Sequence, residues 1–410
     1  MNKQHCPQMV TRRTLLGAVS TLSLAVSVAA QPVESFDHFL AELRTDATAR
    51  GISRATFDAA FAGVMPDQAV MAAMRREPEY GKPMGAYLAS LVSPARIGAG
   101  QRKLAQWGDT LRAAQQRFGI DPAVLVSIWG IESGFGGAPG DWDVFRSLAT
   151  LAQARFQHPL FRNELLSALV ILQQGKIPRR QLAGSWAGAM GQPQFLPSSY
   201  LRYAIDFDGD GRADIWSSVP DVLGSIANYL QKFGWHAGLP WGFEVVVPQK
   251  FDYRTSRGAL RQWAERGFRR ADGGALSDAD TAILFLPSGA SGPAFLVTDN
   301  FIVIKTFNNS DAYALAVGIL SDRLPGAGPL RATWPVDDFQ PSRSQRIALQ
   351  HRLAALGFKI ADFQGHLDFD LRDAVREQQR RFGMIADGYP GRAFLRRLGI
   401  EGGQSDPRRQ

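Results

Sequence analysis

Cysteine is almost absent from this chain, since Cys6 is the only one among 410 residues. It precedes a pair of arginines, Arg12 and Arg13, inside a segment that has the composition of an export signal. Removal of that segment would leave a mature chain with no thiol and no disulfide, so a packed core must hold it together. The composition allows this, because 45% of the residues are hydrophobic and the length is sufficient for two or more domains.

A long membrane-spanning run is also lacking. The apolar run at residues 15–28 is too short and too rich in Ser, Thr and Gly for a firm anchor, and no later segment predicts a transmembrane helix. This run follows a twin-arginine pattern and ends in a small-residue cleavage site at residues 28–30. Residues 1–30 are predicted to be a signal peptide for export to the periplasm by the twin-arginine route; the alternative is an amphipathic or disordered amino terminus. Cys6 lies in the wrong place to accept a lipid at the cleavage site, which predicts that the protein is not a lipoprotein.

Strong charge of either sign is missing as well. The formal net charge is +8, and loss of Lys3, Arg12 and Arg13 with the leader would leave it near +5. The basic residues are scattered and no recognisable nucleic-acid motif accompanies them, which excludes nucleic acid as the expected partner. A modest basic excess suits the anionic polymers of a cell envelope. The six histidines are scattered too, so no water-activating zinc site is expected, and nothing indicates an organic cofactor.

Helical patterns dominate from about residue 35 to residue 229, and short strand-like segments follow. The predicted helices cover residues 35–49, 54–62, 100–118, 161–174, 221–233 and 313–324. The predicted strands cover residues 243–247, 281–286 and 301–304. A cluster of Pro and Gly then introduces a predicted linker, residues 327–341, ahead of a smaller unit at residues 342–400. These features predict a mostly helical α+β protein whose main domain covers residues 31–326.

Glu132 stands out because it ends a run that is otherwise apolar, residues 123–131. Asp121 and Pro122 form a helix start, and the glycines after Glu132 stop the helix. Glu132 is therefore expected at a helix C-terminus in apolar surroundings, where burial and the helix dipole both raise its pKa. A carboxylic acid that stays protonated near neutral pH is what cleavage of a glycosidic bond needs. The alternative is a glutamate that merely ends a core helix and points to solvent.

Small residues, amides and aromatic rings are concentrated at residues 184–200. The side chains that stand out are those of Ser185, Gln192 and Gln194 for hydrogen bonding, and those of Trp186 and Phe195 for flat apolar contact. Aromatic platforms together with amides are the parts of a sugar-binding cleft. A tightly packed helix crossing, which also needs small residues, explains the segment equally well.

An acidic loop follows, with oxygen ligands at positions 1, 3, 5 and 9 of an EF-hand-like pattern and glycine at position 6. The usual acid at position 12 is replaced by Ser217, but a longer loop, residues 206–221, would bring Asp221 round as the closing ligand. The interpretation is a structural Ca²⁺ or Na⁺ site, and the alternative is an Asx-rich surface turn. The predicted ligands are the carboxylates of Asp206, Asp208, Asp210 and Asp221 and the carbonyl of Arg212.

These motifs, taken in order, resemble the lytic murein transglycosylase B family over about residues 35–324. The matching segments are residues 76–80, 129–136, 147–151, 184–200, the acidic loop, 227–229 and 308–310. The tail resembles a small peptidoglycan-binding domain of three helices. Its matching residues are Leu349, Gln350, Leu353, Leu356, Gly357, Phe358, Gly365, Ala374, Phe382, Gly383 and 386–389.

The resemblance implies a lysozyme-like catalytic domain that cleaves the β-1,4 bond between N-acetylmuramic acid and N-acetylglucosamine and leaves 1,6-anhydromuramoyl ends. The partner would be the glycan strands of peptidoglycan, and no protein partner is indicated. Glu132 matches the catalytic acid/base, and the acidic loop matches a metal-binding EF-hand. The residues that match cleft positions are Tyr87, Ser185, Gln194, Tyr229 and Asn308. The family often has tyrosine just before Asn308, where this chain has Phe307.

Two other functions remain open at this point. A hydrolytic muramidase could use the same scaffold, but it would normally need a second carboxylate; Glu164 and Asp143 are the nearest candidates by sequence, and both are interpreted as structural. A wall-binding scaffold without turnover is the third hypothesis, although an inactive protein is free to lose Glu132. The tail, for its part, either concentrates the enzyme on an insoluble polymer or simply packs on the catalytic domain.

Overall fold

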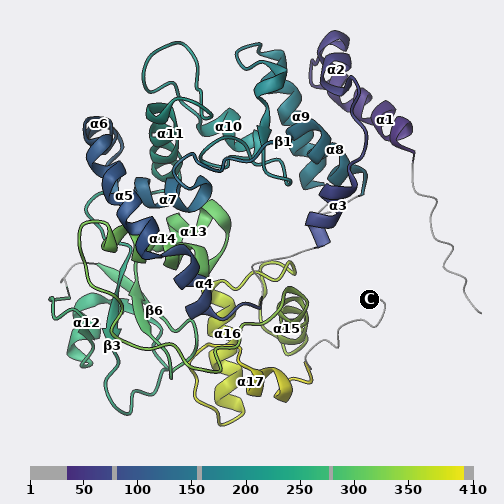
Figure 1. Ribbon diagram of the computed structural model, residues 1–410. Coiled ribbons are helices and arrows are strands. Elements are labelled where there is room, and N and C mark those ends of the chain that lie inside the picture. The colour runs from purple at the N-terminus through teal and green to yellow at the C-terminus, as the bar shows by residue number, and fades with distance from the viewer. Residues whose placement is uncertain (1–34, 76–80, 155–158, 277–279, 401–410) are drawn as a thin grey trace, which may run out of the picture. The chain divides into compact units, whose positions relative to one another are not determined.

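The computed structural model describes residues 35–75, 81–154, 159–276 and 280–400 (Figure 1). The predicted signal peptide at residues 1–30 and the motif at residues 76–80 lie outside the described residues. Among the described residues, no helix combines the length and the apolar character that crossing a membrane requires.

Helices make up most of the main domain (Figure 1). Their bounds are α1 Phe36–Ala49, α2 Arg54–Phe61, α3 Gln68–Arg75, α4 Met84–Leu91, α5 Pro94–Gln106, α6 Gly108–Phe118, α7 Pro122–Ser133, α8 Val144–Gln153, α9 Leu160–Gln173, α10 Pro197–Tyr203, α11 Val219–Lys232, α12 Leu260–Glu265, α13 Asp299–Asn308 and α14 Asp311–Arg323. The prediction of one helix over residues 100–118 is wrong. Two helices, α5 and α6, meet at Trp107 instead, and α5 begins earlier because Ser93 caps it and Pro94 opens it.

A five-stranded antiparallel sheet follows the first eleven helices and has the order β4-β6-β7-β3-β5. Its strands are β3 Gly242–Val246, β4 Arg257–Ala259, β5 Arg269–Arg270, β6 Thr281–Phe285 and β7 Ala294–Val297. The predicted strand at residues 301–304 is wrong, because this apolar run lies inside α13. Thr298 caps that helix by accepting a hydrogen bond from the Asn300 N–H, and the run supplies its buried side. A short apolar run fits a buried helix as well as it fits a strand.

Helix α7 lies at the centre of the main core. Every residue from 123 to 130 is buried, so the helix has no polar face along most of its length. Such a helix must be enclosed on all sides. Helices α5, α6, α11 and α14 pack against it, and together they fix the place where its last turn comes to the surface.

The C-terminal module contains three helices, α15 Arg343–Ala355, α16 Phe369–Arg381 and α17 Arg392–Arg397. It has an apolar core of its own, in which the most deeply buried side chains are Leu349, Leu353, Val375, Phe394 and Leu395. Ser342 and Gln345 form a capping box that starts α15.

The segment between the two modules is held by polar contacts. The carboxylate of Glu244 accepts hydrogen bonds from the backbone N–H groups of Arg331 and Ala332. The carboxylate of Asp338 accepts one from the Gly85 N–H at 3.1 Å and one from the Ser288 hydroxyl at 2.7 Å. The segment predicted as a linker is therefore fastened to the main domain in several places.

The C-terminal module packs directly on the main domain. The ring of Phe369 belongs to the main core and lies 5.7 Å from the ring of Phe285. Beside it, the carboxylate of Asp311 pairs with Lys305 Nζ and with Arg372 Nη2, each at 2.8 Å. We call Lys305, Asp311 and Arg372 the junction triad, since Arg372 comes from α16 and the other two from the main domain.

Charge at the triad makes stability depend on pH. Burial acts to raise the pKa of Asp311, but the charges of Lys305 and Arg372 outweigh it, so the pKa lies below its ordinary value of 3.8. A lowered folded pKa stabilises the native state at any pH above that ordinary value, and this stabilisation is lost as the pH falls through the folded pKa.

We therefore expect Asp311→Asn to lower the free energy of unfolding by about 3–5 kcal/mol near pH 7, since it leaves two buried cations without a counter-charge. The gap to the wild type should narrow below about pH 4, because the unfolded wild-type chain then takes up a proton while the folded carboxylate stays charged until the pH falls through its lower folded pKa. Urea titrations at both pH values measure this. Asp109→Asn, at an exposed ion pair with Arg112, is the matched control and should cost less than about 1 kcal/mol. A gap that stays the same from neutral to acid pH would contradict the role of charge.

Candidate active site

Glu132 lies in the last turn of α7, where the sequence predicts it. The Asp121 carboxylate accepts a hydrogen bond from the Ala123 N–H at 2.7 Å and starts the helix. Gly134 ends it in the left-handed region at φ 60°, and its N–H donates to the Gly130 carbonyl at 3.1 Å. The side chain of Glu132 is half-buried and follows directly on the enclosed part of the helix, residues 123–130.

The chain turns back sharply after Glu132. Phe135 has φ 62°, and its ring lies edge-on to Trp129 with 5.6 Å between centroids. A side chain at Gly130 would collide with that ring, so glycine is needed where the turn folds over the helix. This turn directs the following loop, residues 136–140, toward the segment that carries Ser185.

Close backbone packing brings Ser185 and Gln194 to that loop. Strand β1 (Trp142–Asp143) pairs with β2 (Ala183–Gly184), and side chains at Gly140 or Gly184 would collide with neighbouring backbone. Gln194 has φ 53°, and its Nε2 donates to the Pro139 carbonyl at 2.7 Å. The segment at residues 184–200 thus has both of the properties considered in the sequence analysis. Its small residues allow tight packing, and its polar side chains lie beside the loop after Glu132.

Gln192 and Phe195 are structural, which corrects their expected place in a sugar cleft. Gln192 Oε1 accepts a hydrogen bond from Trp129 Nε1 at 2.7 Å, and its Nε2 donates to the Trp216 carbonyl at 2.8 Å. Phe195 is buried in the main core. Gln192 therefore ties the central helix to the loop after it, and Trp186, which is half-buried, remains the one ring of this segment with an open face.

A group of aromatic side chains surrounds the predicted cleft residue Tyr229. Its hydroxyl donates to the Thr306 carbonyl at 2.9 Å, and burial raises its pKa. Phe307 packs against it with 4.8 Å between ring centroids, and the ring of Phe307 is nearly parallel to that of Tyr313, with 6.3 Å between centroids. At the position where the family often has tyrosine, this chain thus places a ring that packs between two tyrosines.

Tyr313 is the site residue that sequence reasoning missed. It is fully buried, and burial followed by the neighbouring charge of Glu132 raises the pKa of its hydroxyl well above the ordinary value. After burial, Glu132 is the neighbour that acts most strongly on the pKa of this hydroxyl. The phenol stays protonated under these conditions and can only donate to the carboxyl group. Tyr87 and Tyr229 also raise the pKa of this hydroxyl, to a smaller extent than Glu132.

Tyr87 and Asn308 line one cavity of about 120 Å³. The C-terminal module completes its wall with Arg346, His366 and Arg372. Two of the predicted cleft residues are therefore brought together next to the junction triad.

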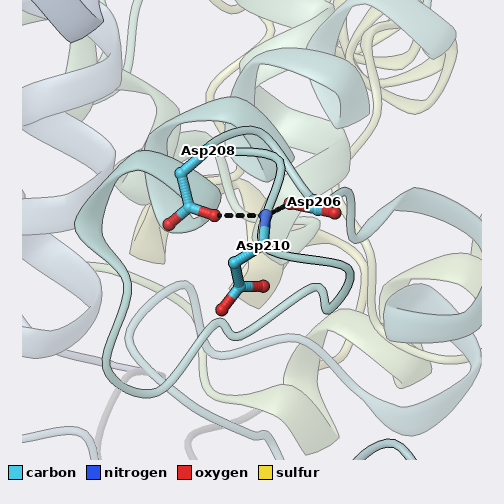
Figure 2. A group of neighbouring side chains, drawn as sticks. All are labelled: Asp206, Asp208 and Asp210. Carbon is cyan, nitrogen blue, oxygen red and sulfur yellow. Dashed lines mark hydrogen bonds between the residues drawn. The ribbon is translucent and has the colours of Figure 1, made fainter.

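The acidic loop gathers three of its predicted ligands. Figure 2 shows Asp206, Asp208 and Asp210 side by side, and one carboxylate oxygen of each lies within 4.8 Å of the others. Asp206 also accepts hydrogen bonds from the backbone N–H groups of Gly209 at 2.7 Å and Gly211 at 2.7 Å, which wraps the loop around it. Hard carboxylate oxygens on an exposed, tightly turned loop fit a cation such as Ca²⁺.

Asp221 has a different position from the one predicted. It is completely buried, and its two oxygens accept hydrogen bonds from the N–H groups of Phe207 at 2.7 Å and Asp214 at 2.8 Å. It thus joins the two ends of the loop and lies outside the group of three carboxylates. The side chain of Arg212 pairs with Asp210 at 3.4 Å.

A mostly helical domain whose enclosed central helix ends in one carboxylic acid, with tyrosines and amides around it, defines a lysozyme-like enzyme that acts on glycans. The chain belongs to the transglycosylase SLT domain family, whose model matches residues 35–322. The model of a peptidoglycan binding domain matches residues 342–398.

Characterised relatives agree with this assignment. The chain is 33% identical to membrane-bound lytic murein transglycosylase B of Escherichia coli K12 over 248 residues, which is 57% of this chain and 66%, just under two thirds, of that relative. The crystal structure of SltB3 from Pseudomonas aeruginosa in complex with NAG-anhNAM-pentapeptide is 46% identical and covers 89% of this chain and 100% of its own, with a TM-score of 0.81. The Escherichia coli lytic transglycosylase Slt35 in complex with calcium is 26% identical over 73% of this chain and 94% of its own, with a TM-score of 0.58.

Gln192 offers a direct test of how the site is built. Gln192→Leu would leave the buried Trp129 indole N–H without an acceptor and the Trp216 carbonyl without its donor, so we expect a loss of about 2–4 kcal/mol in the free energy of unfolding. Urea unfolding followed by tryptophan fluorescence measures it. Gln231→Leu, an exposed amide on α11, should change stability by less than about 0.5 kcal/mol. Equal effects of the two substitutions would show that the Trp129–Gln192 contact is dispensable.

Proposed function

We propose that this protein is a lytic murein transglycosylase that cleaves the β-1,4 bond between N-acetylmuramic acid and N-acetylglucosamine and leaves 1,6-anhydromuramoyl ends, with Glu132 as its single acid/base. The observation that carries the proposal is the place of Glu132, at the exposed end of an enclosed helix and beside the buried Tyr313 hydroxyl. Family membership and the relatives' activity on murein support the same reaction.

The reaction needs one carboxyl group acting twice. Protonated Glu132 donates its proton to the glycosidic oxygen while the bond from that oxygen to the anomeric carbon breaks. The N-acetyl group of the muramoyl sugar, or the charge of the site, stabilises the oxocarbenium-like carbon that results. Ionised Glu132 then takes the proton of the O6 hydroxyl as that oxygen bonds to the anomeric carbon, which restores the acid. An intramolecular nucleophile competes well with water because its effective concentration is high.

Tyr313 and the polar loop segments assist without exchanging protons in this scheme. The Tyr313 hydroxyl stays protonated because its pKa is raised, and it is the proposed hydrogen-bond donor to the carboxyl group of Glu132 in either protonation state of that group. Ser185, Gln194, Tyr87, Tyr229 and Asn308 are the proposed substrate contacts, with the N-acetyl and hydroxyl groups of the sugars as their partners.

Hydrolysis on the same scaffold is the competing proposal within enzymes. It would normally use a second carboxylate about 5–9.5 Å from the first. Of the two acids considered, Glu164 accepts hydrogen bonds from the Ser198 N–H at 2.8 Å and the Ser198 hydroxyl at 2.7 Å. Asp143 caps α8 and pairs with Arg179 at 2.7 Å. Both are occupied in holding helices, which favours the single-acid mechanism.

Glu132→Gln tests the proposal. The amide keeps the shape of the side chain but has no acidic proton, so release of anhydromuropeptides from sacculi should fall by at least about 10²-fold. Mass spectrometry distinguishes anhydro ends, reducing ends and no cleavage. Glu265→Gln, an exposed acid that pairs with Arg261 on α12, is the control and should retain activity. A Glu132→Gln variant that works at the wild-type rate would remove Glu132 from the mechanism.

The remaining features fit a cell-wall enzyme. We propose that the C-terminal module binds peptidoglycan strands and that residues 1–30 direct export to the periplasm through the twin-arginine route, without lipid attachment. A reporter that folds in the cytoplasm before export, fused after residue 35, tests the leader through its appearance in the periplasmic fraction. Replacement of Arg12 and Arg13 by lysine should abolish its export.

The acidic loop is proposed to hold a structural Ca²⁺ or Na⁺ through Asp206, Asp208 and Asp210. The gathered carboxylates support this, as does the relative Slt35, whose structure is a complex with calcium. Asp221 would act indirectly, by keeping the two ends of the loop together.

Calcium should raise the melting temperature, because an ion that binds only the native loop stabilises the native state, by about 2.7 kcal/mol at a hundredfold excess over its Kd. Asp206→Ala combined with Asp210→Ala should erase that gain and leave the chemistry largely intact at low temperature. Asp37→Ala combined with Asp109→Ala removes the same charge elsewhere and should keep the gain. A wild-type protein whose melting temperature ignores calcium would end the metal proposal.

A further inference from the structure

The junction triad connects the C-terminal module to the turn between α13 and α14. Lys305 lies in the last turn of α13, and Asp311 is the first residue of α14. Arg372, on α16, pairs with Asp311, and Asp311 also pairs with Lys305, so Arg372 is connected to both helices. Only 5% of the Arg372 side chain is exposed. Lys305 Nζ also donates to the Leu367 carbonyl of the C-terminal module at 2.9 Å. The module thus holds this turn from two sides.

Two residues of the proposed active site flank this turn, Asn308 before it and Tyr313 after it. Asn308, a proposed substrate contact, ends α13, and Asn309 follows in the left-handed region at φ 47°. The hydroxyl of Ser310 accepts a hydrogen bond from the Tyr313 N–H and starts α14. Tyr313 lies only two residues beyond Asp311, and α14 packs along α7, the helix of Glu132. A shift of the first turn of α14 would therefore move Tyr313 relative to Glu132.

We propose that Arg372 is a positioning residue for the reaction: from the C-terminal module it fixes Asp311, and through the first turn of α14 it keeps Tyr313 against Glu132 and Asn308 in the cleft wall. This inference rests on the proposed function of Glu132. It gives the C-terminal module a second task besides the proposed binding of the wall, since catalysis on any substrate then depends on the contact of Arg372 with Asp311.

The same helix supplies a matched control. Arg376 lies one turn beyond Arg372 on α16 and is equally buried, with 6% of its side chain exposed. It also reaches the main domain, where its Nη2 donates to the Leu284 carbonyl of β6 at 3.0 Å. That contact lies on the sheet and does not involve the turn before α14. Loss of Arg376 therefore weakens docking of the module but leaves the junction triad intact.

The experiment uses the full chain and a soluble tetrasaccharide of alternating N-acetylglucosamine and N-acetylmuramic acid, so that binding to insoluble wall plays no part. We expect Arg372→Met to lower kcat by at least about 10-fold with little change in KM, because small displacements of catalytic groups are costly. Arg372→Lys should keep a higher kcat than Arg372→Met, since an ammonium group can still pair with Asp311, although it loses the contact of the guanidinium with the Phe285 ring. Arg376→Met should keep kcat within about 2-fold even though its melting temperature falls.

A double-mutant cycle tests the route through Tyr313. In a Tyr313→Phe background, Arg372→Met should have little further effect on kcat, because both substitutions disturb the same contact with Glu132. Near-UV circular dichroism reports whether each variant folds, and Arg372→Gln takes the place of the methionine variant if that one does not. Equal losses of kcat in the Arg372 and Arg376 variants, or fully additive effects with Tyr313→Phe, would overturn the proposal. Failure of the Glu132→Gln test, by contrast, would remove the proposed function itself.

Discussion

Enclosure of α7 is the constraint on which the rest of the structure depends. A helix that is apolar on every side has to be surrounded before it is stable. Four helices surround this one, the two that precede it in the chain and two from more distant parts. Enclosure buries residues 123–130, and Glu132 lies in the turn that follows, where the side chain is half-buried. The hydrogen bond from Trp129 to Gln192 then ties the helix to the segment that carries Ser185 and Gln194. One packing arrangement therefore positions both the acid and the polar groups beside it.

The parts of the site that sequence predicts are those encoded by neighbouring residues. Asp121 and Pro122 start α7 and Gly134 ends it, so the position of Glu132 could be read from a dozen residues. The three clustered carboxylates of the acidic loop belong to one short turn and could be found in the same way. Helices α1, α2, α7, α9, α11 and α14 and strands β3 and β6 were also recognisable from local periodicity and caps, whereas α3, α4, α8, α10, α12 and α13 were not predicted. The errors at residues 100–118 and 301–304 occur where a local apolar pattern fits two structures and only packing chooses between them.

What could not be predicted depends on contacts between distant segments. Tyr313 looks like one more ring on an apolar helix until α14 is placed along α7 and the hydroxyl meets Glu132. Gln192 and Gln194 have the same side chain and lie two residues apart, yet they have different partners. The amide of Gln192 is hydrogen-bonded to Trp129 and Trp216, whereas the amide of Gln194 donates to the loop after Glu132. Asp221 has a carboxylate that could bind a metal, but it is buried under the loop, where its two oxygens accept hydrogen bonds from backbone N–H groups. Residue type alone does not separate these cases.

The chemistry of the junction explains why a wall-binding module would be joined to an enzyme in this way. The ring of Phe369 already supplies apolar burial between the modules, and apolar contacts tolerate small sliding motions. Buried charges do not, because a displaced carboxylate between two cations loses its partners in a medium of low dielectric. Asp311 therefore fixes the position of the C-terminal module on the main domain more than it strengthens the contact between them. A fixed position matters here because Asp311 opens the first turn of α14, and that turn carries Tyr313, whose pKa responds to Glu132.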